Sequence, residues 1–264
     1  MKQKHNIVAK LLGGLSLLIY FFLWAPVIVI IVFSFSSNKY GTSWDGFTLN
    51  WYAALFNNAD VKDALIRSLV IASITVVVST IIGTITGYGL FKLHFRGKQF
   101  LRTSILLPIV FPSVVTGSAL LVFFTRFIQI PLGYPSIIIA HIVFSSPLAV
   151  FVILGRMQRF DWSWEEAAMD LGATRFRTFW RVTGPMLLPA IAASAMLIFP
   201  WSFDDFVITY FVAGIGSTTL PIYVFSQLRF GATPVINTIG TLFVLLTMVA
   251  LALMYFIQKK NESI

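Results

Sequence analysis

Long apolar runs without a single charged residue constrain this chain more than any other feature. The clearest run extends from Leu11 to Phe35, and comparable runs recur along the sequence. A helix needs about 20 apolar residues to cross the core of a bilayer. Only 11% of the residues are charged, whereas a soluble domain carries about a quarter. The sequence therefore predicts an all-α membrane protein, with residues 1–264 forming a single transmembrane domain.

Charged residues at the ends of the apolar runs set the limits of the expected membrane spans. Gly214, Gly216 and Pro221 break the apolar segment 207–230, which favours an irregular outer segment over a further span. The aromatic stretch from Asn50 to about Phe56 favours a short helix at the membrane surface, with direct contact to a ligand as the alternative. Six transmembrane helices are expected, at about residues 11–35, 68–91, 103–125, 136–155, 186–206 and 236–257.

Lysine and arginine residues predict the orientation of these spans. If the N-terminus lies inside, 14 of the 19 cationic residues lie on the inner side and 5 on the outer side. This bias predicts a multi-pass membrane protein with both termini in the cytoplasm. The net charge of +9 is then explained by contact with membrane lipid, and no nucleic acid is expected. The chain contains no cysteine, so disulfides and thiolate metal sites are excluded.

The inner loop over residues 156–185 carries signals for two short helices. Ser163 to Glu166 fits a capping box, with Ser163 as the N-cap. A helix is expected over residues 164–171, with Gly172 as its left-handed stop. A second helix is expected over residues 174–182, and Pro185 is expected to end it.

The first of these helices has the composition of a docking element. Small side chains at Ala167 and Ala168 permit close approach of a partner, and Glu166 and Asp170 would face cationic groups on it. A solvated loop helix is the alternative interpretation. The predicted coupling residues are Glu165, Glu166, Ala167, Ala168, Asp170 and Gly172.

Glu166-Ala167-Ala168, followed by three residues and Gly172, resembles the EAA loop of permease subunits in bacterial ATP-binding-cassette (ABC) importers. The family pattern continues with Ile, one residue and Leu-Pro, where this chain has Val182 and Gly184-Pro185. The resemblance implies a type I ABC importer permease fold and a transport subunit that is not itself an enzyme. It implies a multi-pass protein of the bacterial inner membrane and three kinds of partner: a second permease subunit, two ATP-binding subunits, which would bind the ATP, and an extracytoplasmic substrate-binding protein. No cofactor of its own is expected.

Four further stretches resemble the spermidine/putrescine branch of this family, in particular its second permease subunit. Neighbouring branches transport other organic cations or ferric ion, so these remain alternatives for the solute. The stretches are Phe95-Arg96-Gly97-Lys98, Leu171-Gly172-Ala173, Phe203-Asp204-Asp205-Phe206-Val207 and Leu220-Pro221-Ile222-Tyr223.

A translocation path or gate is expected where polar and helix-breaking residues lie at membrane depth. Pro108 and Pro112 interrupt the third span, and Pro112 is placed near the bilayer midplane. Broken helices are tolerated where they line a cavity, with simple kinks as the alternative. Ser113 follows the second proline, where polyamine permeases often carry an acid, and this departure weakens the polyamine interpretation.

Asp204 and Asp205 are the intramembrane acids, and such residues are functional candidates. Successive helix positions point about 100° apart, so both acids are not expected to face one cavity. They would pair with ammonium groups, and Trp201 offers a face for cation–π contact. A gating role, with Arg126 or Arg229 as partner, is the alternative. His141 is interpreted as a hydrogen-bonded packing residue.

The sequence shows no catalytic constellation, no metal-ligand motif and no phosphate-binding glycine loop. A transporter without such a loop must obtain ATP hydrolysis from a separate chain. Two other classes remain open: an ion-coupled secondary transporter that uses Asp204 and Asp205 as a proton relay, and a membrane scaffold that transports nothing.

Overall fold

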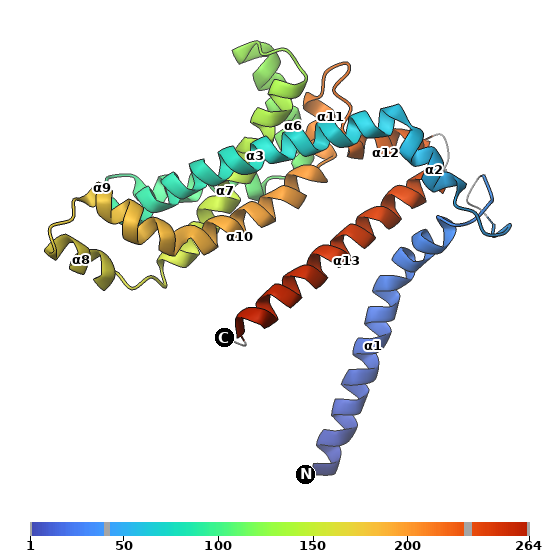
Figure 1. Cartoon of the computed structure of the whole chain (residues 1–264). Coiled ribbons are helices and arrows are strands. Elements are labelled where there is room, and N and C mark those ends of the chain that lie inside the picture. Colours follow the sequence, from blue (N-terminus) through green and yellow to red (C-terminus); the bar gives the residue numbers. More distant parts are fainter. Residues whose placement is uncertain (1, 40–42, 230–233, 263–264) are drawn as a thin grey trace. The chain divides into compact units, whose positions relative to one another are not determined.

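A computed structural model describes residues 2–39, 43–229 and 234–262 (Figure 1), with side chains described over 12–39, 43–229 and 234–248. In these residues the chain is helical, apart from an isolated antiparallel bridge between Ser36 and Phe47. The predicted all-α class is thus confirmed for the described chain. The chain divides into two compact units, Met1–Lys62 with Val224–Ile264, and Asp63–Tyr223.

The first unit contains α1 (Lys2–Phe33), α2 (Asn50–Asn57), all of α13 (Pro234–Glu262) and most of α12 (Leu220–Arg229). Helices α1 and α2 both contact α13. Gly240 of α13 leaves room for α1, because an added Cβ would lie 3.2 Å from the side chain of Ile30. The helix expected from Asn50 is confirmed as α2.

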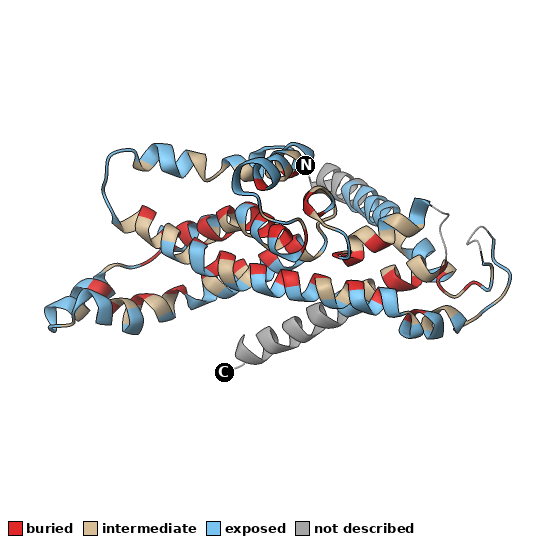
Figure 2. Ribbon diagram, turned by 90° about the horizontal axis from the view of Figure 1, so that it is seen from above, coloured by how far each residue is buried: buried red, intermediate tan, exposed pale blue. Residues whose placement is uncertain are grey.

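The second unit is built on three long helices, α3 (Ala59–Lys92), α7 (Tyr134–Met157) and α10 (Gly184–Phe203). An added Cβ on Gly83 would collide with Ala149, and one on Gly87 would lie 2.9 Å from Ile153. The contact moves four residues forward on both helices, from Gly83 to Gly87 on α3 and from Ala149 to Ile153 on α7. The two helices therefore run parallel. Helix α10 packs along α7, and buried residues follow these three helices (Figure 2).

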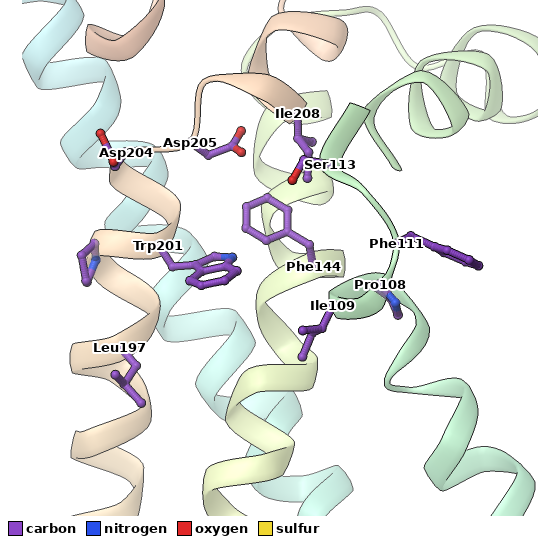
Figure 3. Close-up of a pocket in the computed structure, with 11 residues that line it drawn as sticks. Pro108, Ile109, Phe111, Ser113, Phe144, Leu197, Trp201, Asp204, Asp205 and Ile208 are labelled. Carbon is purple, nitrogen blue, oxygen red and sulfur yellow. The ribbon is translucent and has the colours of Figure 1, made fainter. Parts of the chain in front are cut away.

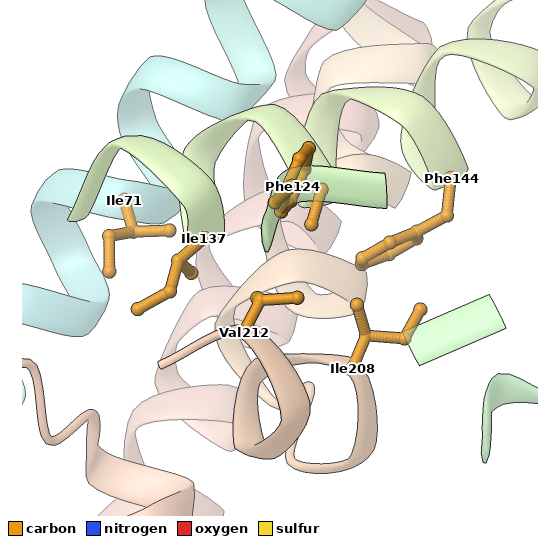
Figure 4. Packing of buried hydrophobic residues seen from close by; sticks show 7 residues of the cluster. Ile71, Phe124, Ile137, Phe144, Ile208 and Val212 are labelled. Atoms are coloured by element: carbon orange, nitrogen blue, oxygen red, sulfur yellow. The ribbon is translucent and has the colours of Figure 1, made fainter. Parts of the chain in front are cut away.

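A buried hydrophobic cluster fastens short helices to this frame (Figure 4). It joins α3 and α7 to the π-helical turn η1 (Phe123–Ile128) and to α11 (Val207–Val212). Gly117 of α6 (Ser113–Val122) lies against α11, where an added Cβ would be 2.8 Å from the ring of Phe211. The cluster members are Ile71, Phe124, Ile137, Ala140, Phe144, Ile208 and Val212.

Among the described residues, four single helices are long and apolar enough to cross a membrane, and they match the first, second, fourth and fifth predicted spans. The apolar described part of α13, Pro234–Met248, falls at the sixth. The four are Leu12–Phe33, Ala59–Lys92, Tyr134–Met157 and Arg175–Phe203.

The third predicted span, 103–125, is not one helix. Lys98–Val110 and Ser113–Ile128 meet at a bend of 104°. The break falls at Phe111 and Pro112, because proline cannot donate the backbone hydrogen bond that would continue the helix. The sequence prediction of an interruption here is confirmed, and the bend is far larger than a simple kink.

The apolar segment predicted to be irregular over residues 207–230 is irregular in its described part, 207–229. It forms α11, then a turn with Gly216 at a φ of +82°, then α12. Gly214 approaches the backbone of Leu132 so closely that an added Cβ would collide with it.

Candidate functional site

The predicted docking helix is present as α8 (Ser163–Asp170), but it begins differently from the expected capping box. Ser163 is the first helical residue, and its backbone N–H donates to Asp161 at 3.1 Å. Hydrogen bonds from the Ser163 side chain and backbone lower the pKa of Asp161 below its ordinary value. The N-cap of α8 is Trp162, which makes no side-chain capping bond, and Asp161 just before it accepts the N–H of Ser163. The expected capping box is wrong, because both of its N–H groups have other partners: that of Ser163 donates to Asp161, and that of Glu166 donates to Trp162 O at 3.3 Å.

The end of α8 confirms the predicted stop at Gly172. Gly172 has a φ of +86°, which favours glycine. Its N–H donates to Met169 O at 2.9 Å, and the N–H of Ala173 donates to Ala168 O at 3.0 Å. These two bonds form a Schellman motif, which satisfies the last carbonyls of the helix and turns the chain sharply.

Four of the six predicted coupling residues form an exposed face on α8. Glu166, Ala167, Asp170 and Gly172 are exposed, and Ala168 is half-buried. Large apolar side chains accompany them: Leu171 is 90% exposed. Exposed apolar residues in a charged loop are typical of a protein contact surface. The others in this loop are Trp164, Met169, Phe176 and Trp180.

Glu165 lies apart from that exposed face. It is buried, and its side chain pairs with Lys92 at the end of α3 and with Thr183. The sequence grouped Glu165 with its neighbours because it considered spacing along one helix only. Lys92 and Thr183 were missed, because a lysine at the cytoplasmic end of a span is already explained by membrane topology.

The second loop helix does not end at Pro185 as expected. Helix α9 (Arg175–Thr178) continues through the π-helical turn η2 (Phe179–Thr183) into α10. Pro185 lies in the first turn of α10, where its missing N–H costs little. Residues 175–203 thus form one continuous helical path, which joins the end of this loop to the fifth predicted span.

A cavity of about 460 Å³ lies between the break in the third predicted span and the end of α10 (Figure 3). Helix α5 (Leu107–Val110) and the start of α6 form one wall, and α10 with the start of α11 forms the other. The break in the helix thus lines a cavity, as the sequence predicted. The lining residues are Pro108, Ile109, Phe111, Ser113, Phe144, Leu197, Pro200, Trp201, Asp204, Asp205 and Ile208.

The cavity brings together four of the five residues predicted for the path: Ser113, Trp201, Asp204 and Asp205 line it. Pro112 stands at the break itself, as the N-cap of α6, and is not among the lining residues. Phe111 and Phe144 were not predicted from the sequence, because their apolar side chains carry no signal that separates a cavity wall from a core.

Both acids face this cavity, contrary to the expectation from helical spacing. Helix α10 ends at Phe203, so Asp204 and Asp205 are no longer on a regular helix. Pro200 has no N–H and weakens the last turn. Asp204 is exposed, whereas the side chain of Asp205 is only 13% exposed.

Asp205 is held by a buried hydrogen-bond network. Its carboxylate accepts bonds from the N–H and the hydroxyl of Thr209 at 2.8 and 2.9 Å. His141 lies 2.8 Å from the Thr209 hydroxyl and 2.7 Å from the Ser202 hydroxyl. The interpretation of His141 as a hydrogen-bonded packing residue is confirmed. The network leaves Asp204 as the more accessible acid.

The chain matches the family model "Binding-protein-dependent transport system inner membrane component" over residues 79–262. It belongs to this family, whose members are permease subunits, and the fold and the exposed loop helices fit that class. The chain is therefore a permease subunit of an ABC importer.

Curated relatives of similar length carry specific names. The chain is 35% identical over 92% of its length to the Haemophilus influenzae spermidine/putrescine transport system permease protein PotC, and it covers 95% of that protein. It is 36% identical to PotC of Escherichia coli K12, with 92% of each chain covered. It is 38% identical to the E. coli K12 putrescine transport system permease protein PotI, with 92% and 86% covered.

Solved structures share the fold. A bacterial ABC transporter involved in the import of the acidic polysaccharide alginate has a chain with a TM-score of 0.72 and 17% identity, and 96% of each chain is covered. The MetNI methionine ABC transporter, in inward-facing conformations, gives a TM-score of 0.57 at 14% identity, with 81% and 97% covered. These similarities support the fold alone.

Proposed function

We propose that this permease subunit imports spermidine and putrescine across the bacterial inner membrane, and that the cavity is part of the path. The placement of Asp204, Asp205 and Trp201 on one cavity carries the proposal. Carboxylates pair with ammonium groups, and an indole face attracts cations. The names of the PotC and PotI relatives agree with a polyamine solute.

The proposed topology has six spans, with both termini in the cytoplasm, and both compact units belong to one transmembrane domain. Three observations support it: the helices at the predicted spans, the distribution of cationic residues, and the parallel course of α3 and α7. Two spans separated by one further crossing must run in the same direction, as α3 and α7 do.

A cytoplasmic ATPase is the proposed partner of α8 and α9, and it would bind and hydrolyse the ATP. The exposed acids Glu166 and Asp170 would meet cationic groups, and the exposed Leu171 would enter an apolar pocket. A second, different permease would complete the path. Two ATP-binding subunits and an extracytoplasmic binding protein would complete the transporter; the alginate ABC transporter of similar fold was solved in complex with a periplasmic protein.

Uptake of labelled spermidine and putrescine tests this proposal, in cells with and without this gene and with the other subunits present. Loss of saturable, ATP-dependent uptake is expected in the deletion, and restoration on complementation. Unchanged polyamine uptake, with loss of uptake of ferric ion or another organic cation, would contradict the polyamine assignment and leave the permease class intact.

A further inference from the structure

The carboxylate of Glu165 is buried inside the loop that carries the exposed coupling residues. One oxygen, Oε2, lies 2.6 Å from Lys92 Nζ, and the other, Oε1, accepts a hydrogen bond of 2.5 Å from the Thr183 hydroxyl. The Glu165 side chain is 7% exposed and that of Lys92 is 32% exposed. Both oxygens of this acid are thus occupied within the subunit, which leaves neither for an ATPase.

Aromatic side chains cover the ion pair. Lys92 Nζ lies 3.6 Å from the centroid of the Trp162 ring, within the range of a cation–π contact. Phe91 in turn stacks on Trp162, with 5.0 Å between the two ring centroids. Shielding from water strengthens the attraction between the two charges, so this pair is unlike an exposed surface salt bridge.

The three segments joined here are distant in the sequence. Lys92 is the last residue of α3, Glu165 lies in the first turn of α8, and Thr183 ends η2 where α10 begins. Helix α10 then leads to Trp201 and Asp204 at the cavity. In Figure 1, α8 and α9 lie at one end of this unit and α11 at the other. The carboxylate therefore joins the docking helix to the helix that lines the cavity.

We infer that Glu165 is a positioning residue, which with Lys92 and Thr183 fastens the docking helix to α3 and α10 and transmits its movement to the cavity. The inference rests on the proposed coupling to an ATPase. It separates the roles of two adjacent acids: Glu166 meets the partner from outside, and Glu165 holds α8 from inside.

Stability alone does not account for this arrangement. Replacing a buried ion pair by apolar residues is often neutral or stabilising, so such a pair is weak evidence for a contribution to folding. Hydrogen-bond and ion-pair networks that join rigid elements are among the contacts that carry coupling between distant sites, and the contacts of Glu165 form such a network. The test must therefore measure coupling as well as stability.

The experiment uses the complete transporter with its binding protein in proteoliposomes, and it measures labelled spermidine imported per ATP hydrolysed. Glu165→Gln removes the ionic contact and keeps an acceptor for Thr183. A fall of about tenfold in imported spermidine per ATP is expected, since coupling between sites typically amounts to about 5–150-fold. ATPase co-purification is expected to stay unchanged. Thr183→Val, which leaves the ion pair intact, is expected to lower the same ratio.

The charge swap Lys92→Glu with Glu165→Lys supplies the rescue test, and Lys92→Arg supplies the conservative variant. Lys92→Arg is expected to keep most of the ratio, whereas the swap is expected to recover part of it, because a carboxylate at position 92 loses the contact with the Trp162 ring. Asp161→Asn is the matched control, because it changes an exposed acid of the same loop and keeps a capping oxygen. An unchanged ratio of imported spermidine to ATP in Glu165→Gln would overturn the inference. So would a lowered ratio that the swap does not raise at all, or one that is lowered only in proportion to a loss of co-purified ATPase.

A second measurement does not depend on the solute. The chain contains no cysteine, so spin labels at Met169→Cys on α8 and Leu188→Cys on α10 are unique; both native side chains are exposed. A narrow distance distribution is expected in the parent and in the swap, and a broad one in Glu165→Gln. Equal widths would overturn the inference, whereas failure of the parent to import spermidine would count only against the proposed solute.

Discussion

The carboxylate of Asp205 accepts two hydrogen bonds from Thr209, one from the backbone N–H at 2.8 Å and one from the hydroxyl at 2.9 Å. Asp205 thereby satisfies a free N–H group in the first turn of α11. The adjacent acid, Asp204, is exposed at the cavity. Two neighbouring acids of the same type thus have different environments, and their substitutions should have different effects.

Asp204→Asn is expected to raise the half-saturation concentration for spermidine about tenfold, since a hydrogen bond to a charged group contributes about 1.5–3 kcal/mol. Thermal stability of the purified complex should stay unchanged. Concentration-dependent uptake in cells measures the first effect. A variant that loses expression level instead of affinity would contradict a role for Asp204 in contact with the solute.

Asp205→Ala is expected to destabilise the subunit by about 0.5–2 kcal/mol, the usual cost of losing a capping side chain. Its effect should appear as a lower melting temperature of the purified complex. Asp205→Asn, which retains an acceptor for Thr209, should recover most of that loss. Equal melting temperatures for Asp205→Ala and the parent would show that the bond to Thr209 does not hold α11.

Trp201→Ala should lower the affinity for spermidine by about two- to fivefold, because a cation–π contact at an exposed site contributes about 0.5–1 kcal/mol. Trp201→Phe retains an aromatic face and should recover part of the loss. Leu188→Ala, an exposed position on the same helix, is the control. An equal loss in the phenylalanine and alanine variants would contradict an aromatic contact.

Glu166→Lys combined with Gly172→Asp should abolish co-purification of the ATPase while the subunit still inserts into the membrane. The first change reverses an exposed charge, and the second places a side chain at a φ of +86°, which costs about 1–2 kcal/mol for an L-residue. Pull-down from solubilised membranes measures the effect. Full retention of the ATPase would count strongly against α8 as a docking element.

Gly117→Leu should destabilise the contact between α6 and α11, because even a Cβ would lie 2.8 Å from Phe211 and 3.3 Å from Ile208. Overpacking of this kind typically costs about 1–3 kcal/mol. Gly155→Leu on α7 has no atom within 4 Å of the added Cβ and serves as the control. Thermal unfolding of both variants in detergent measures the effect, and Gly117→Leu should have the lower melting temperature. Equal melting temperatures would contradict the packing argument.

Several local features could be predicted from the sequence because they depend on neighbours in the chain. The apolar runs indicated the positions of the long helices, and the prolines indicated the break in the third predicted span. Gly172 indicated the end of α8, which its positive φ confirms. A local error arose at the start of that helix, where Asp161 bonds the N–H of Ser163 in place of the expected capping box.

The sequence by itself determined the class of protein, the positions of its helices and the loop that resembles a coupling element, since hydrophobic length, charge bias and turn chemistry act over a few residues. Only the tertiary structure decided which of two adjacent acids is free. It buried Glu165 against Lys92 and Thr183, and it held Asp205 through Thr209 while leaving Asp204 exposed. The physical reason is that Lys92 lies on another helix far from Glu165 in the sequence, and that Thr209 is itself held by His141, 68 residues away, so packing determines the environment of each carboxylate.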